Sequence, residues 1–203
     1  VDTSALTTIV DDAFVGSDDP MGMAARGAAV VQDGKLILLR DGAGIEPSTS
    51  LLGWSRTKTV TAMLAYKKLQ EQGIDIETPV VDAFPQGRAP SWVEQWKADD
   101  RKAVTIADLL FMRSGLALGE GYGPTGDVVQ MLYGEQDMSA WAASHPLDHQ
   151  PATYWEYLSA STVILSEVVR AQFATDQEYV DFAYDELFEP IGVTTATLST
   201  DAS

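Results

Sequence analysis

The chain has 203 residues, 45% of them hydrophobic, which is enough for one substantial domain with its own core. Its 30 acidic residues outnumber its 13 basic ones. The net charge of −17 argues against nucleic acid or an anionic membrane as a partner, because such a surface repels phosphate groups. The sequence has no cysteine, which excludes disulfides, thiolate metal sites and a cysteine nucleophile. No apolar run approaches the roughly 20 residues that a membrane span needs.

The first 50 residues predict one helix followed by one β-hairpin. An apolar repeat at helical spacing, with Ser4 as a candidate cap, predicts a helix over residues 4–14. Residues 27–40 read GAAVVQ-DG-KLILLR. Asp33 and Gly34 between two apolar runs are a strong signal for a hairpin turn.

The remaining residues predict a mostly helical region. Residues 55–72 have a helical pattern that ends at Gly73, and glycine is common just past a helix end. Thr105 and Asp108 form a capping-box-like pair at the start of a short helix that Gly115 stops. Further helices are predicted at 126–133, 137–144, 161–173 and 176–188, with irregular chain at 74–103 and a Gly-rich loop at 116–126.

The order of these elements predicts one domain with two parts. Residues 1–50 contribute a helix and an antiparallel hairpin to an α/β part, and residues 51–203 form the mostly helical part. Two strands alone make a poor sheet. Either the hairpin packs in an unusual way, or the strands that complete the sheet lie beyond Ser203. Of the two, we expect an incomplete domain.

Ser55 and Lys58, in the segment GWSRTKTVTAML, are the strongest candidates for chemistry. They are three residues apart at the start of a predicted helix, so hydroxyl and amine share one face. A serine hydroxyl is a weak nucleophile until a base removes its proton. Lysine can be that base where burial and the positive end of a helix disfavour its ammonium form. Backbone N–H groups at the helix start can stabilise an oxyanion, so the pattern suits acyl transfer.

The same four residues have a plainer interpretation. Ser-x-x-Lys occurs by chance in many proteins, and serine is a common helix cap. From these residues alone, a capping Ser55 and a solvated Lys58 fit better than catalysis. Trp54 is most simply a packing residue under this turn. The residues that flank this segment favour catalysis over helix capping.

The segment LLGWSRTKTVTAMLAYKKLQEQGIDIETPV resembles the active-site helix of the penicillin-recognising serine hydrolases, the serine β-lactamase-like superfamily. The likeness continues through VTIADLLFMRSGL and PATYWEYLSASTVILSEVVR, and covers about residues 28–203. Within the superfamily the chain is similar to class C β-lactamase-like esterases and 6-aminohexanoate-oligomer hydrolases. The resemblance implies an α/β (α+β) fold of the β-lactamase/transpeptidase type. The chain looks like an N-terminal portion of one catalytic domain.

The resemblance also implies roles for individual residues. Ser55 matches the acylated nucleophile, and Lys58 matches the lysine that activates it. Tyr157 matches the tyrosine of a Tyr-x-Asn or Tyr-x-Ser element, whose phenol relays a proton to the leaving group and helps to keep the lysine neutral. Ser159 matches the third position of that element, where it can hydrogen-bond Lys58 or a substrate carbonyl. By residue type alone, Tyr157 is more often a core or capping aromatic.

The function implied is a serine hydrolase that cleaves an ester or amide through an acyl-enzyme on Ser55, with no metal or organic cofactor. A D-alanyl peptidase or a β-lactamase keeps this chemistry with another substrate. The third family motif, Lys-Thr-Gly or His-x-Gly, is absent from the chain. The alternative hypothesis is therefore a non-catalytic fragment or pseudoenzyme that binds a missing C-terminal portion or self-associates. The compartment stays open between periplasm or secretion and the bacterial cytoplasm.

Two further groups of residues are candidates for binding. Tyr122 and Trp155 are the aromatic residues expected to line a substrate pocket, although aromatic side chains more often pack. His145 and His149 would form a metal-binding pair on a helix, but the prolines beside them break a helix. We therefore expect a loop there and no metal site.

Overall fold

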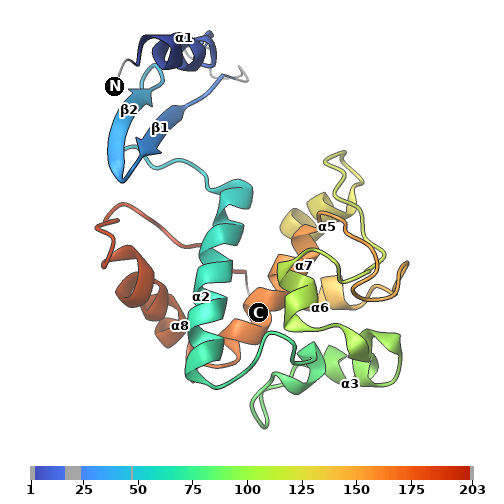
Figure 1. The fold of residues 1–203 in the computed structure, drawn as a ribbon. Helices are drawn as coiled ribbons and strands as arrows, with labels where there is room; N and C mark the ends of the chain where they lie inside the picture. The colour runs from blue at the N-terminus through green and yellow to red at the C-terminus, as the bar shows by residue number, and fades with distance from the viewer. Residues whose placement is uncertain (1–2, 17–23, 47, 202–203) are drawn as a thin grey trace. The chain divides into compact units, whose positions relative to one another are not determined.

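The structure is a computed structural model that describes residues 3–16, 24–46 and 48–201. The chain divides into two compact units, Val1–Leu51 and Leu52–Ser203 (Figure 1). The first contains a hairpin and a helix, and the second consists of helices and loops. Within the described ranges, no helix has the length and apolar character that crossing a membrane requires.

The hairpin of the first unit follows the sequence pattern closely. Strands β1 (Gly27–Gln32) and β2 (Lys35–Asp41) pair antiparallel, with one register shift near the middle of β1. Asp33 and Gly34 have left-handed φ angles of 50° and 72°. That backbone is the tight turn that Asp-Gly favours, because its twist matches the twist of the two strands. The predicted hairpin is confirmed.

Helix α1 (Ser4–Asp12) precedes the hairpin. The N-cap position belongs to Thr3, which makes no side-chain cap hydrogen bond, so the cap expected at Ser4 is wrong. Ser4 is already the first helical residue. The Nε of Arg40 lies 3.1 Å from Oδ1 of Asp11, which joins the helix to β2.

The second unit is helical, and α7 is at its centre. Its longer elements are α2 (Thr57–Glu71), α3 (Trp92–Lys97), α4 (Ile106–Leu110), α5 (Asp127–Gly134), α6 (Met138–Ala143), α7 (Ser159–Arg170) and α8 (Asp176–Ala183). Shorter turns are the 3-10 turns η1 (Trp54–Arg56), η2 (Val80–Asp82) and η3 (Asp100–Ala103), and the π-helical turn η4 (Tyr184–Phe188). Helix α7 packs against α2, α4, α5 and α6 (Figure 1).

The core of this unit is one buried cluster to which both α7 and α3 contribute. Ile164, Leu165 and Val168 occupy one face of α7 at helical spacing and are buried. The buried rings of Trp92 and Trp96 lie 5.0 Å apart between their centroids. Each such side chain contributes about 1.5–3 kcal/mol when fully buried. This packing fixes α7, whose first turn carries Ser159.

The expectation that residues 74–103 are irregular is wrong in part. This stretch contains α3 with η2 and η3, and Trp92, Val93 and Trp96 of α3 are buried. Helix α3 has six residues, and isolated helices of that length are unstable in water. Its helical state therefore depends on burying the two tryptophans, which local sequence does not reveal.

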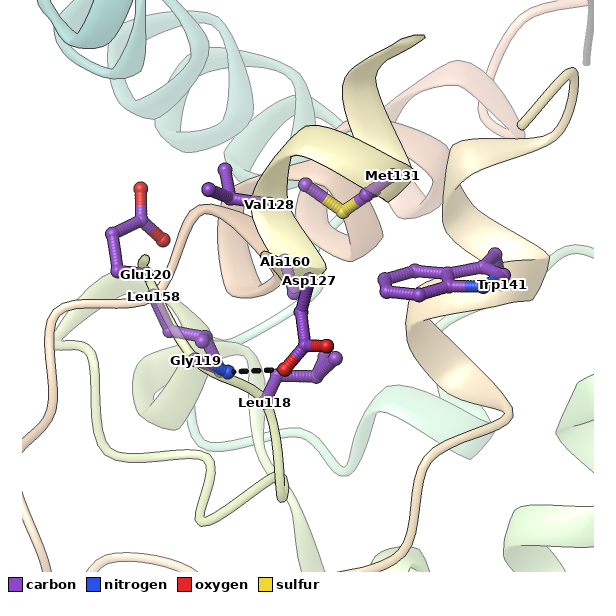
Figure 2. Close-up of a pocket in the computed structure, with 9 residues that line it drawn as sticks. All are labelled: Leu118, Gly119, Glu120, Asp127, Val128, Met131, Trp141, Leu158 and Ala160. Atoms are coloured by element: carbon purple, nitrogen blue, oxygen red, sulfur yellow. Dashed lines mark hydrogen bonds between the residues drawn. The ribbon is translucent and has the colours of Figure 1, made fainter. Parts of the chain in front are cut away.

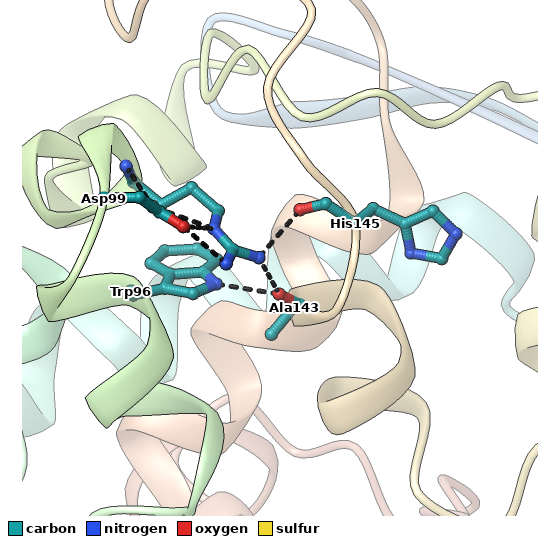
Figure 3. A network of polar contacts seen from close by, with 5 residues as sticks. Trp96, Asp99, Ala143 and His145 are labelled. Atoms are coloured by element: carbon teal, nitrogen blue, oxygen red, sulfur yellow. Dashed lines mark hydrogen bonds and ion pairs between the residues drawn. The ribbon is translucent and has the colours of Figure 1, made fainter.

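A polar network holds η3 to the end of α6 (Figure 3). Nη1 of Arg101 donates to the carbonyl oxygens of Ala143 at 2.8 Å and His145 at 3.0 Å. Nη2 forms an ion pair with Asp99 at 2.7 Å. The indole Nε1 of Trp96 donates to the same Ala143 carbonyl at 2.8 Å. Three segments, α3, η3 and the end of α6, are thereby joined around one buried guanidinium.

Helix ends carry the signals that the sequence predicted. Gly73 follows α2 with φ 68°, and its N–H donates to Gln70 in the hydrogen-bond pattern of a glycine-terminated helix. The capping box of Thr105 and Asp108 is confirmed, with both reciprocal hydrogen bonds present. Helix α4 ends earlier than Gly115, at Leu110.

The later helices agree with the prediction in position, with small shifts at their ends. Helices α5, α6 and α8 begin within one residue of the predicted starts. The predicted 176–188 helix continues past α8 as the π-helical turn η4. Helix α7 begins at Ser159, two residues before the predicted start, so Ser159 stands in the first helical turn.

Candidate active site

Ser55 lies in the 3-10 turn η1, directly before α2. The preceding residue, Trp54, has a left-handed φ of 45°, which is uncommon for a residue other than glycine and turns the chain sharply into the helix. The N-cap positions of η1 and α2 belong to Gly53 and Arg56, and neither makes a side-chain cap hydrogen bond. Ser55 therefore does not cap the helix, and its residue is exposed.

Trp54 does not fill the packing role expected of it. Its side chain is 59% exposed, because the sharp turn at Trp54 directs it to the surface. The turn is instead stabilised by Arg56, whose guanidinium donates to the carbonyl oxygens of Leu52 at 2.8 Å and Gly53 at 3.3 Å.

Lys58 connects Ser55 to the start of α7. Its Nζ lies 3.0 Å from Oγ of Ser55 and 3.0 Å from Oγ of Ser159. The first contact follows from the i, i+3 spacing at the start of α2, as the sequence predicted. The second joins residues 101 apart in sequence. Lys58 is half-buried and Ser159 is 7% exposed, so the link is largely shielded from water.

Backbone pairing brings the Tyr-x-Ser element to Lys58. The segment after α4 runs alongside residues 146–156: the amide of Glu156 donates to Met112 at 2.9 Å, and that of Ala152 donates to Arg113 at 3.0 Å. Gly115 has φ 77°, and a Cβ there would lie 2.2 Å from the carbonyl oxygen of His149. Glycine is therefore required for these two segments to approach each other.

Tyr157 approaches Lys58 through its ring. The Nζ of Lys58 lies 4.9 Å from the ring centroid, a cation–π distance. The tyrosine is half-buried. The structure thus brings Tyr157 to the same cluster as Ser55, Lys58 and Ser159, and its role as a proton relay stays a prediction.

Glu120, which the sequence interpretation missed, binds Ser159 at two points. Its Oε2 accepts the Ser159 backbone N–H at 2.8 Å, and its Oε1 accepts the Ser159 hydroxyl at 2.5 Å. The hydroxyl of Tyr122 donates to the same Oε1 at 3.1 Å. The local sequence gives one weak signal, an acidic residue two positions before Tyr122 in a Gly-rich loop. Its partner is 39 residues away.

Tyr122 lies beside both Glu120 and Ser55. The hydrogen bond to the Glu120 carboxylate raises the pKa of Tyr122, and a hydrogen-bonding interaction with the Ser55 side chain lowers that pKa by a smaller amount. The phenol therefore stays protonated at neutral pH. Tyr122 is 60% exposed, so its ring is accessible from solvent.

The other residues that the sequence analysis considered for binding are Trp155, His145 and His149. Trp155 is 66% exposed, and its proposed role in substrate binding stays a prediction. The Nδ1 of His145 lies 2.9 Å from the Trp141 carbonyl oxygen, while the ring of His149 stacks on Tyr154 at 4.1 Å. Both histidines lie outside helices, as expected. In the described part of the chain, no three metal-binding side chains of the His, Asp or Glu type gather.

A cavity of about 440 Å³ lies in the second unit between α2, α7 and α8, apart from the Ser55–Lys58–Ser159 cluster. Burial raises the pKa of the Glu167 carboxyl on its wall, and repulsion from Asp137 and Asp201 adds to this effect. The residues that line it are Thr57, Val60, Thr61, Leu64, Met138, Ser139, Val163, Ser166, Glu167, Arg170, Asp176, Tyr179, Val180, Ala183, Leu198, Ser199, Thr200 and Asp201. They do not include Ser55, Lys58 or Ser159.

The fold matches a known architecture. A solved structure from Bacteroides dorei DSM 17855, described as a "putative beta-lactamase", superposes with a TM-score of 0.71 at 18% identity. The match covers 98% of this chain and 55% of that chain, so this chain spans about half the length of that relative. At this identity the likeness shows the fold alone, and the expected β-lactamase/transpeptidase-like fold is confirmed.

The sequence match gives the family. The family model for beta-lactamases matches residues 13–203, and the chain therefore belongs to the beta-lactamase family. This confirms the broad family that the Ser55 and Tyr157 segments indicated. A comparison with curated proteins gave no match.

Proposed function

We propose that the protein is a serine hydrolase that cleaves an ester or amide through an acyl-enzyme on Ser55. One observation carries the proposal. The Lys58 amine lies 3.0 Å from the Ser55 hydroxyl, within the range for direct proton transfer between a nucleophile and its base. Ser55 is exposed to a substrate and is not used as a helix cap.

The proposed reaction starts with Lys58 in its neutral form. Its Nζ takes the proton from Ser55 Oγ as that oxygen bonds to the substrate carbonyl carbon, and the carbonyl oxygen takes the negative charge. The positive end of the η1–α2 turn favours that charge. The intermediate collapses by breaking the C–O or C–N bond, and the proton that Lys58 took is passed on to the leaving group, which returns Lys58 to its neutral form. Water, deprotonated in the same way, then cleaves the acyl-enzyme and restores Ser55.

Tyr157 is proposed to deliver the proton to the leaving group and to help keep Lys58 neutral. Its ring lies against Lys58, which supports a place beside the reacting atoms. Tyr122, Trp155 and Ser159 are proposed to contact the substrate. Tyr122 is supported by its exposed side chain and by its hydrogen bond to Glu120, the carboxylate that binds Ser159. No metal or organic cofactor takes part in the proposed mechanism.

The activity is proposed for the whole protein, since this chain spans 55% of the Bacteroides dorei relative. The proposed domain joins residues 1–50 and residues 51–203 in one catalytic unit with further strands. Apolar side chains on the hairpin support this: Val31, Leu36 and Leu39 are 63%, 58% and 60% exposed, as expected for strands that complete a larger sheet. We also propose that the substrates are those of carboxylesterases and amide-oligomer hydrolases.

The test is Ser55→Ala in the whole protein, with Ser144→Ala as the matched control. Ser144 is exposed, and its hydroxyl is bound to the Trp141 carbonyl. Ser55→Ala should abolish hydrolysis of a p-nitrophenyl ester and labelling by a fluorophosphonate, with unchanged circular dichroism. Ser144→Ala should retain both. Full activity of Ser55→Ala would overturn the proposal.

The same assays separate the alternatives. Hydrolysis of nitrocefin or of a D-alanyl-D-alanine peptide in preference to simple esters and linear amides would place the substrate with the β-lactamases or D-alanyl peptidases. Fluorophosphonate labelling of the whole protein but not of residues 1–203 alone would show that this chain requires a further segment. No labelling of either would favour a non-catalytic member of the family.

A further inference from the structure

Glu120 controls the hydrogen of one hydroxyl at the candidate site. An ionised carboxylate can only accept hydrogen bonds. The Ser159 hydroxyl has one hydrogen, and its Oγ lies 2.5 Å from Oε1 of Glu120. That hydrogen is therefore directed to Glu120. The second contact, from the Ser159 N–H to Oε2 at 2.8 Å, fixes the position of the carboxylate at the first turn of α7.

The direction of this hydrogen determines what Lys58 can do. Because Ser159 donates to Glu120, its oxygen can only accept from Lys58 Nζ at 3.0 Å. A neutral amine has two N–H groups and one lone pair. With an N–H directed to Ser159, the lone pair is available to the Ser55 hydroxyl on the other side, also at 3.0 Å. A Ser159 hydroxyl able to rotate would instead donate into that lone pair and compete with Ser55.

The loop around Glu120 holds the carboxylate in place. The Gly119 N–H donates to Oδ2 of Asp127 at 2.9 Å, and a Cβ at Gly126 would lie 1.9 Å from the Gly121 carbonyl oxygen, so the loop closes tightly on the start of α5. Figure 2 shows this Gly119–Asp127 hydrogen bond and Glu120 beside it, on the wall of a small pocket. The Tyr122 hydroxyl adds a further donor to the carboxylate, at 3.1 Å from Oε1.

We propose that Glu120 is a positioning residue that acts through Ser159. It fixes the Ser159 hydroxyl as an acceptor for Lys58 and so leaves the Lys58 lone pair to Ser55. The proposal rests on the serine hydrolase function proposed above and adds a residue that acts without touching the reacting atoms.

The first test is Glu120→Gln in the whole protein, assayed on a p-nitrophenyl ester. The amide of glutamine offers one acceptor and one donor group, so it cannot accept both the N–H and the O–H of Ser159. We expect kcat to fall about 10- to 100-fold, as for the loss of a hydrogen bond to a charged group, with a smaller change in KM. The control Glu135→Gln removes a carboxylate that accepts only from Gln130 among its side-chain contacts in the described structure, and kcat should stay within about twofold.

The deciding test is a double-mutant cycle with Ser159→Ala. If Glu120 acts through Ser159, Glu120→Gln should change kcat by less than about threefold once the hydroxyl is absent. Wild-type kcat in Glu120→Gln would overturn the proposal. Effects that multiply in full in the double variant would also overturn it, because Glu120 would then act independently of Ser159.

A second variant keeps the test decisive if Glu120→Gln does not fold. Glu120→Asp retains the charge but is one methylene shorter, so it cannot reach both Ser159 atoms, and it should show the same fall in kcat and the same dependence on Ser159. Wild-type kcat in this variant would overturn the proposal. Failure of the proposed function itself has a different signature, since Ser55→Ala would then remain active.

Discussion

Two polar networks in the second unit each join segments that are distant in the sequence, and they are built in opposite ways. In the Arg101 network (Arg101, Asp99, Trp96 and the carbonyls of Ala143 and His145), the acceptors are one carboxylate and two backbone carbonyls. Arginine does not lose its proton in proteins. No proton can move in such a cluster, and its effect is to hold η3, α3 and the end of α6 together.

The Lys58 network (Ser55, Lys58, Ser159 and Glu120) consists of short polar side chains bound to one another. Its central groups are two hydroxyls and an amine, each able to donate or accept, and one end is exposed at Ser55. This difference in composition indicates different roles for the two networks. A network that ends on backbone carbonyls stabilises the fold, whereas a chain of exchangeable hydrogens that ends at an exposed hydroxyl can carry out proton transfer.

Lys58→Met gives the largest expected effect on activity. Loss of the base should lower kcat/KM for a p-nitrophenyl ester about 100- to 10,000-fold. The free energy of unfolding should change by less than about 1 kcal/mol, since the side chain is half-buried and methionine retains its apolar stem. Ester kinetics and urea unfolding measure the two quantities. Large destabilisation with retained activity would contradict the assignment of this network to chemistry.

Arg101→Met should show the reverse. The variant leaves the partly buried His145 carbonyl without its donor, removes one of the two donors to the Ala143 carbonyl and deprives Asp99 of its ion pair. We expect this to lower the free energy of unfolding by about 2–4 kcal/mol. Activity per folded molecule should stay near that of the wild type. Urea unfolding and active-site titration with a fluorophosphonate check the two halves of the prediction. A fall in kcat with unchanged stability would show that the two networks are not separate.

The smallest expected effect is a pH dependence from Asp99. Its hydrogen bond to Arg101 lowers the pKa of Asp99 below the ordinary value of 3.8. A carboxyl with a lowered pKa in the folded state stabilises the fold above its unfolded pKa, and that contribution is lost as pH falls through the folded pKa. The stability difference between wild type and Asp99→Asn should therefore be present at pH 6 and shrink toward pH 3. Urea unfolding across this range tests it, and a difference that grows toward pH 3 would contradict it.

The sequence predicted the parts of the site that depend on local spacing. Ser55 and Lys58 meet because they are three residues apart at a helix start, and Asp33-Gly34 forms a turn because of its own backbone preferences. Glu120 was missed because its contact depends on a loop that folds onto a residue 39 positions away. The wrong expectation for Trp54 has a related cause. Its aromatic character suggested packing, but the left-handed backbone sets the direction of the side chain.

The backbone pairing at Gly115 has a consequence for how the protein responds to heat. The segment before Tyr157 is held to the chain after α4 mainly by amide hydrogen bonds, including those of Asp148, His149 and Glu156, while α7 is held by a buried apolar face. Local opening costs less free energy where few apolar side chains are buried. The segment should therefore detach before the core unfolds and take Tyr157 away from Lys58. Thermal inactivation would then begin below the melting temperature of the helical core.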